Sequence, residues 1–71
     1  MFQDGIQYEF QPAEEGGYVV NVPAARGCWS EGDTFEEALT NIQDALREWL
    51  SLAKEKGFKL TPELQAVGSV R

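Results

Sequence analysis

The sequence predicts an α+β fold in which a three-stranded antiparallel meander is followed by one long helix and a final strand (β-β-β-α-β). Three features predict this order: an alternating apolar segment near the N-terminus, a glycine turn followed by a second such segment, and a long stretch with helical apolar spacing. A helix that follows a meander covers one face of the sheet. The 71 residues allow one domain, spanning 1–71, with a small core.

The first two predicted strands form a hairpin. Residues 6–11 alternate apolar and polar side chains, which is typical of a half-buried strand. The glycines at 16–17 provide the turn, and residues 18–22 form the second strand, which a proline ends. Residues 28–31 are predicted as a weaker third strand, mainly because little else fills the space before the helix.

The strongest predicted element is a helix of about 22 residues, roughly 33 Å long at 1.5 Å per residue. Apolar residues recur at helical spacing from Phe35 to Ala53. Thr34, with Glu37 three residues later, forms a capping box, and Gly57 is a natural residue for the left-handed position after a helix. Because this helix is longer than a typical strand, we expect its far end to overhang the sheet or to meet a second subunit.

The C-terminal residues predict a final strand over 64–70. A short helical turn at 61–64 is the alternative, because threonine followed by proline is also a helix start. A right-handed crossover would place the strand parallel to the first strand, at the edge of the sheet. We expect this apolar edge to form an oligomer interface, with the side chains of Leu64, Ala66, Val67 and Val70.

Composition and charge exclude several classes of function. Six Lys and Arg against twelve Asp and Glu give a net charge of −6, and the scattered cations form no basic stripe, so we expect no direct nucleic-acid binding. An acidic surface suits a basic partner or plain solubility. The absence of histidine excludes Ser-His, Cys-His and zinc-histidine chemistry. Without a signal peptide, a long apolar run or a second cysteine, the chain is expected to be cytoplasmic and not to bind membranes.

The densest acidic cluster surrounds the predicted start of the helix. It consists of Glu31, Asp33, Glu36 and Glu37. Carboxylates can hold divalent cations, but Glu36 and Glu37 diverge by about 100° around a helix. Helix capping is enough to explain why acidic residues occupy positions 33 and 37. We therefore interpret the cluster as a solvated rim or a partner-facing patch, and we expect no metal site, no cofactor and no catalytic residue.

Neighbouring residues on the third strand point to opposite faces of the sheet. If Cys28 faces the helix, it is a buried, inert cysteine, although Arg26 and the nearby helix start could lower its pKa. Trp29 then faces the uncovered side. There it either forms part of a protein interface, where tryptophan is enriched, or is shielded by local loops.

The stretch from Gly16 to Leu39 resembles the HicB-type antitoxin family. It contains Gly-Gly-Tyr-Val-Val-Asn-Val-Pro, then Gly-Cys, Gly-Asp-Thr and Glu-Glu-Ala-Leu, in that order. The resemblance covers about residues 6–60 and implies a partly degraded ribonuclease-H-like fold without its nuclease centre. It also implies assembly into dimers or higher oligomers and binding of a small basic HicA-type toxin that cleaves mRNA.

Two departures from that family pattern affect the expected function. Residues 24–27 read Ala-Ala-Arg-Gly where family members often carry Asp-Leu-Pro-Gly, so any contact made by that acid is missing. Longer members add a C-terminal segment that binds operator DNA, whereas only residues 69–71 follow Gly68. We therefore expect no autorepression through direct DNA binding by this chain alone.

The predicted function is that of a HicB-like antitoxin, a non-enzymatic protein that neutralises its toxin by covering the toxin's active surface. The predicted partner-binding residues are Trp29, Glu31, Asp33, Glu36 and Glu37. The alternative is a toxin-free homo-oligomeric interaction module. A residual metal-dependent nuclease is less favoured, because it requires several carboxylates to converge on strand ends.

Overall fold

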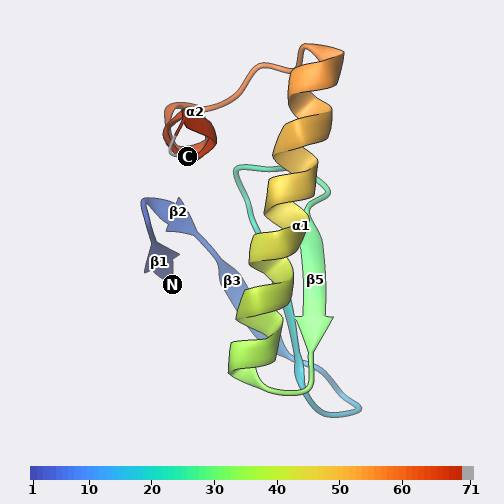
Figure 1. Cartoon of the computed structure of the whole chain (residues 1–71). Helices are drawn as coiled ribbons and strands as arrows, with labels where there is room; N and C mark the ends of the chain where they lie inside the picture. The colour runs from blue at the N-terminus through green and yellow to red at the C-terminus, as the bar shows by residue number, and fades with distance from the viewer. Residues whose placement is uncertain (70–71) are drawn as a thin grey trace.

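A computed structural model describes the backbone of residues 1–69 and the side chains of residues 1–65. The elements in this range are β1 (Phe2–Gln3), β2 (Ile6–Gln7), β3 (Glu9–Pro12), β4 (Tyr18–Asn21), β5 (Trp29–Gly32), α1 (Phe35–Lys56) and α2 (Pro62–Ser69). Strands β3, β4 and β5 form an antiparallel sheet with β4 in the centre, and α1 runs along one face of it (Figure 1). The α+β class, the three-stranded meander and the long helix are confirmed.

The register of the sheet places Phe10, Val20 and Ser30 in one row beneath the helix. The predicted first strand is divided at Tyr8, which is buried and separates β2 from β3. The predicted third strand is present as β5, shifted by one residue. Apolar alternation therefore located the first two strands of the meander, although the first is interrupted, and the third was located from the space left before the helix.

Helix α1 begins and ends as the sequence predicts. The Thr34 hydroxyl accepts a hydrogen bond from the Glu37 backbone N–H at 3.1 Å. The Glu37 carboxylate accepts one in return, but from the N–H of Asp33, one residue before the cap, at 2.7 Å. At the other end, Gly57 has φ 73°, and the N–H of Phe58 donates to the carbonyl oxygen of Ala53 at 2.9 Å. This is a Schellman motif, which satisfies the last carbonyl groups of the helix.

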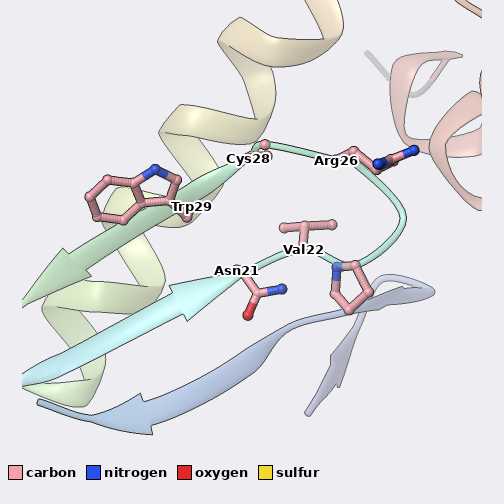
Figure 2. Close-up of a pocket in the computed structure, with 7 residues that line it drawn as sticks. Asn21, Val22, Arg26, Cys28 and Trp29 are labelled. Atoms are coloured by element: carbon pink, nitrogen blue, oxygen red, sulfur yellow. The ribbon is translucent and has the colours of Figure 1, made fainter.

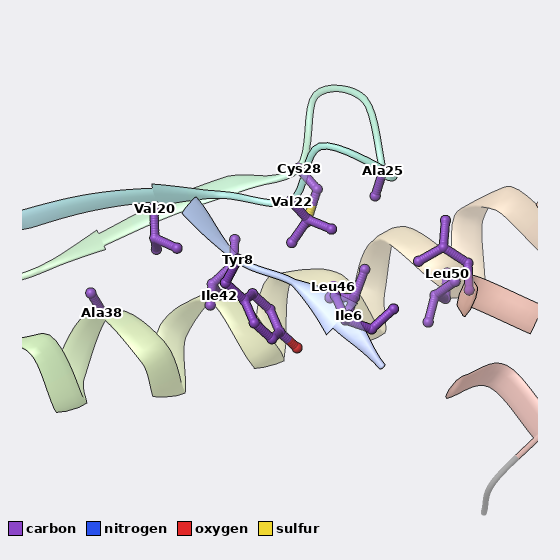
Figure 3. Packing of buried hydrophobic residues seen from close by; sticks show 11 residues of the cluster. Ile6, Tyr8, Val20, Val22, Ala25, Cys28, Ala38, Ile42, Leu46 and Leu50 are labelled. Carbon is purple, nitrogen blue, oxygen red and sulfur yellow. The ribbon is translucent and has the colours of Figure 1, made fainter. Parts of the chain in front are cut away.

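The core lies between α1 and the covered face of the sheet. Figure 3 shows buried side chains of the strands and of the β4–β5 loop facing α1. The buried residues of the cluster are Ile6, Tyr8, Val20, Val22, Ala25, Cys28, Ala38, Ile42, Leu46, Leu50 and Leu64. The part of the helix that was predicted to overhang the sheet is thus partly covered within the chain, because Ile6 and Ala25 pack beyond the end of the three-stranded sheet. Leu64 of α2 belongs to the same buried cluster.

A short N-terminal hairpin precedes the predicted strands. β1 pairs with β2 through a two-residue turn in which Asp4 (φ 54°) and Gly5 (φ 81°) both have positive φ. This turn geometry favours Asp-Gly, because both residues tolerate the left-handed region. The N–H of Tyr8 donates to the carbonyl oxygen of Met1 at 2.7 Å, which extends the pairing to the first residue.

The predicted final strand is wrong, because α2 occupies residues 62–69 in its place. The alternative helical turn at 61–64 is confirmed and extends to Ser69. The Thr61 hydroxyl accepts from the Leu64 N–H at 3.4 Å, and the Thr61 carbonyl accepts from the Gln65 N–H at 2.9 Å. Threonine before Pro62 therefore starts a helix, so there is no crossover strand parallel to the first strand in the described part of the chain.

The edge-strand geometry behind the predicted oligomer interface is therefore also wrong. Leu64 is buried in the core, with 1% of its surface exposed. Ala66 and Val67 lie in α2, but their side chains are outside the described set, and Val70 lies beyond residue 69. An interface at these three residues stays a prediction. Within the described residues, neither helix is long and apolar enough to cross a membrane.

The close approach of β5 and α1 requires glycine at position 32. A Cβ atom there would lie under 3 Å from backbone atoms of Glu37 and Ala38, which belong to the first turn of α1. We predict that Gly32→Ala lowers the free energy of unfolding by about 1–3 kcal/mol, because the helix must move away from the sheet. Urea denaturation followed by circular dichroism measures this.

Ser30→Ala is the matched control, since Ser30 lies on the same strand and faces the same side. It should change the free energy of unfolding by less than about 1 kcal/mol, as expected for a half-buried position without a close backbone contact. Equal stability of the two variants would show that the helix does not approach β5 this closely.

Candidate protein-binding face

The face of the sheet opposite α1 carries no described element of the chain. Because side chains alternate along a strand, the residues next to the buried ones point to this side. It is formed by Glu9, Gln11, Val19, Asn21, Trp29 and Glu31, which are exposed or half-buried. We call this set the uncovered face. It contains two carboxylates, one large aromatic ring and no lysine or arginine.

The strand register arranges the uncovered face in two rows. Glu9, Asn21 and Trp29 lie side by side in one row, and Gln11, Val19 and Glu31 lie in the next. Trp29 is therefore at the β5 margin of the face, with Glu31 two residues further along the same strand. The face combines the apolar side chains of Val19 and Trp29 with one carboxylate on each outer strand.

Trp29 is 58% exposed, so no local loop shields it. Figure 2 shows Trp29 on β5 and Asn21 on the neighbouring strand β4. Beside them lies an open hollow of about 340 Å³, lined by Asn21, Val22, Pro23, Arg26, Gly27, Cys28 and Trp29. Of the two alternatives for Trp29, the structure favours a site available to another molecule over shielding within the chain.

The predicted partner-binding residues divide into two groups. Trp29 and Glu31 lie together on the uncovered face. Asp33 follows β5, whereas Glu36 and Glu37 lie in the first turn of α1, on the other side of the sheet. All five are exposed, but the Glu37 carboxylate already accepts a hydrogen bond from the Asp33 N–H. The acidic cluster of the sequence is thus not one patch in space.

Sequence reasoning missed four residues of the uncovered face: Glu9, Gln11, Val19 and Asn21. The alternation of side chains along each strand could have identified them, because these four residues lie between the positions that were predicted to be buried. Pairing the three strands in register would have placed Glu9 and Glu31 on the same side as Trp29. The search for acidic residues close together in the sequence instead selected the helix start.

Metal binding has no support in the geometry. Among the described residues, no three acidic or cysteine side chains come close enough together to hold a metal ion. The acids of the uncovered face, Glu9 and Glu31, stand on the two outer strands with β4 between them. Surface carboxylates arranged in this way contribute negative potential to the uncovered face.

Cys28 faces the helix side and is buried, as predicted. Burial in apolar surroundings raises the pKa of its thiol, because the thiolate would lose its hydration. The pKa of Tyr8 is raised as well, first by burial and then by the charges of Asp4 and Cys28. A raised thiol pKa opposes nucleophilic chemistry, so Cys28 acts as a small core residue.

Comparison with known protein families gives a match over nearly the whole chain. Residues 7–70 match the model described as the HicB-like antitoxin of bacterial toxin–antitoxin systems. The chain belongs to the HicB-like antitoxin family. The family assignment confirms the resemblance noted in the sequence, and the match extends beyond residue 60, where the noted resemblance ended.

Several UPF0150 proteins are similar to this HicB-like chain. One from Thermoplasma acidophilum is 47% identical over 47 residues, covering 66% of this chain and 68% of the relative. One from Synechocystis is 40% identical over 55 residues, covering 78% and 74%. A third, from Helicobacter pylori, is 46% identical over 37 residues, covering 52% and 51%.

The raised pKa values of Cys28 and Tyr8 predict a loss of stability at alkaline pH. Both groups hold their protons more tightly in the folded chain than in the unfolded chain. Their contribution is therefore complete below the ordinary thiol pKa of 9.0 and is lost as the pH rises through the folded values. Urea midpoints should therefore stay nearly level from neutral pH to about pH 8 and fall between there and about pH 11.

Cys28→Ala isolates the contribution of the thiol to the pH dependence of stability. This variant should be less stable than the parent at neutral pH, because it loses buried volume, but its stability should decline less between neutral and alkaline pH. An identical decline in both proteins would show that the Cys28 thiol has an ordinary pKa.

Proposed function

We propose that this protein is an antitoxin that binds a small, basic, mRNA-cleaving toxin of the HicA type and neutralises it by covering its active surface. Membership of the HicB-like antitoxin family supports a toxin as the partner. The observation that carries the proposal is the uncovered face, which combines exposed Trp29 with Glu9 and Glu31 and has no cation. In this proposal, the uncovered face is the surface that the toxin contacts.

Electrostatic attraction would guide the two proteins together. The chain has a net charge of −6, and the carboxylates of the uncovered face point away from the protein's own core. Electrostatic potentials of opposite sign on two proteins raise their association rate, and potentials of like sign suppress contacts with acidic proteins. A toxin that acts on RNA needs a cationic surface to hold the phosphates of its substrate. The acidic uncovered face would attract that same cationic surface of the toxin.

Trp29 would act as the anchor of the interface. This large aromatic side chain is more than half exposed, so a partner that covers it removes much apolar surface from contact with water. The hollow beside the indole offers space for a side chain of the toxin, with Asn21 and the backbone of the β4–β5 loop around it. Binding energy would then concentrate on this part of the sheet, with Glu31 alongside.

The remaining predicted residues have secondary places in the proposal. Asp33 directly follows β5 and would extend the negative potential of the uncovered face. Glu36 and Glu37 lie on α1 and would contact only a partner that reaches around the edge of the sheet. We therefore assign the main contacts to Trp29, Glu31 and Glu9 in place of the helix start.

Neutralisation would be steric and electrostatic, without any reaction by this chain. The proposed antitoxin carries no histidine and needs neither metal nor cofactor to cover a surface. Its acidic face would repel RNA and DNA, and it would act in the cytoplasm, where mRNA is cleaved. The relationship to a partly degraded ribonuclease-H-like fold stays a prediction, with α2 in place of the last strand.

The toxin to test is the product of a neighbouring reading frame that encodes a small basic protein. We predict that the two proteins co-purify and that Trp29→Ala weakens binding by at least about 30-fold, as expected for an interface anchor worth about 2 kcal/mol. Titration calorimetry measures the affinity, and an mRNA cleavage assay measures neutralisation. Absence of any complex at micromolar protein would contradict the proposal.

Charge reversal tests which surface the toxin contacts. Glu31→Lys should weaken binding by at least about tenfold, because it sets like charges against each other at the interface. The matched control is Glu55→Lys, which makes the same charge change at an exposed position on α1. Equal losses in the two variants would mean that only net charge matters and that the uncovered face is not the contact surface.

A further inference from the structure

The hollow beside Trp29 is lined by groups of different chemistry. Trp29 contributes an indole ring, Asn21 a carboxamide, and the β4–β5 loop joins the two strands at its end (Figure 2). Its volume of about 340 Å³ is near the lower limit of ligand pockets in proteins. The hollow therefore suits one long side chain of a partner better than a cofactor.

The loop that closes the hollow is held in place from the helix side. The Trp49 indole on α1 donates to the carbonyl oxygen of Arg26 at 3.0 Å. Within the loop, the Val22 N–H donates to the Cys28 carbonyl at 3.1 Å, and the Cys28 N–H donates to the carbonyl of Ala25, which is fully buried, at 2.9 Å. A hollow with fixed walls loses little conformational freedom when a partner side chain enters it.

Two carboxylates give the surroundings of the Trp29 ring a negative potential. Glu31 follows two residues later on the same face, roughly 7 Å along the strand at about 3.4 Å per residue. Glu9 lies in the same row as Trp29, on the other side of β4. The only ion pair among the described side chains joins Arg47 and Asp44 on α1, so no described cation neutralises either carboxylate of the face.

Arg26 lines the hollow but leaves the indole ring open. Figure 2 shows its side chain extending away from Trp29. The residue is also exposed, so solvent and salt screen its charge. Negative charge therefore predominates on the side of the ring where Glu31 lies.

We propose that this hollow binds an arginine side chain of the toxin. Its guanidinium group would stack on the Trp29 indole, with the Glu31 carboxylate and the Asn21 carboxamide oxygen as hydrogen-bond acceptors beside it. The inference rests on the proposed function and specifies the chemical group that the uncovered face recognises. It makes Trp29 an electrostatic contact as well as an apolar one.

The chemistry of the hollow favours arginine over the other long side chains. A guanidinium is planar and weakly hydrated, so it can stack on an aromatic ring and still donate hydrogen bonds in its own plane. Lysine is a strongly hydrated point charge, and an apolar side chain would leave the acceptors of Asn21 and Glu31 unused. Arginine is also a common contact to RNA phosphates, so its capture here would remove a cation from the toxin's substrate surface.

Ring fluorination of tryptophan tests the stacking. Fluorine withdraws electron density from the face of the indole but changes its size and apolar character little. We predict that antitoxin carrying tryptophan with one, two and three ring fluorine atoms binds unlabelled toxin progressively more weakly, by at least about fivefold for the trifluoro form. Titration calorimetry measures the affinities.

The matched control uses the Trp29→Leu variant, in which Trp49 is the remaining tryptophan. Fluorination of this variant should leave its affinity unchanged, because the Trp49 ring is not the one that is stacked. Unchanged or tighter binding of the fluorinated parent, in a complex that Trp29→Ala still weakens, would overturn the arginine site and leave the proposed function standing. Absence of any complex would contradict both.

Asn21→Asp provides a test in the opposite direction. A carboxylate beside the ring should strengthen binding by about two- to fivefold if the hollow holds a cation, and should weaken it if the hollow holds an apolar side chain. Gln43→Glu makes the same charge change on α1, on the other side of the sheet, and should have a smaller effect. Equal gains in the two variants would show that net charge alone is responsible, and would count against a cation in the hollow.

Discussion

The packing of α1 against one face of a three-stranded sheet is the constraint on which the rest of the structure depends. A single helix can cover only one face, and the sequence places its apolar side chains on that side: Val20, Val22 and Cys28 face Ile42 and Leu46. The opposite side is therefore left to residues that tolerate water. Within the described residues of this 71-residue chain no second layer follows, so one face of the sheet is left without a covering element.

The same helix also shapes the edge of the sheet. Because α1 lies close over Gly32, its side chains at 37, 41 and 49 reach backbone groups on or beside β5. This satisfies some of the polar groups that an edge strand otherwise exposes. Trp29 then has two separable features: its side chain belongs to the uncovered face, and its backbone belongs to the edge.

Local signals in the sequence predicted most of the fold. The capping pair Thr34 and Glu37 and the glycine at 57 located α1 to the residue, because these signals depend on backbone geometry within one turn. The Asp4–Gly5 turn was an equally local signal that was overlooked. The C-terminal segment was misassigned because its short apolar run fits a strand or a helix, and the hydroxyl of Thr61 decides between them. The uncovered face depends on strand register, a long-range property, so only Trp29 and Glu31 of its members were predicted.

Mapping of the toxin contact by amide chemical shifts tests the central claim most directly. The isotope-labelled antitoxin is titrated with the unlabelled product of a neighbouring small basic reading frame. If the uncovered face binds the toxin, the largest shifts fall on Glu9, Val19, Trp29 and Glu31, while exposed positions on the outer side of α1, such as Glu55, change little. Shifts concentrated on α1, with the sheet unaffected, would contradict the claim that this chain acts through the face that its helix leaves open.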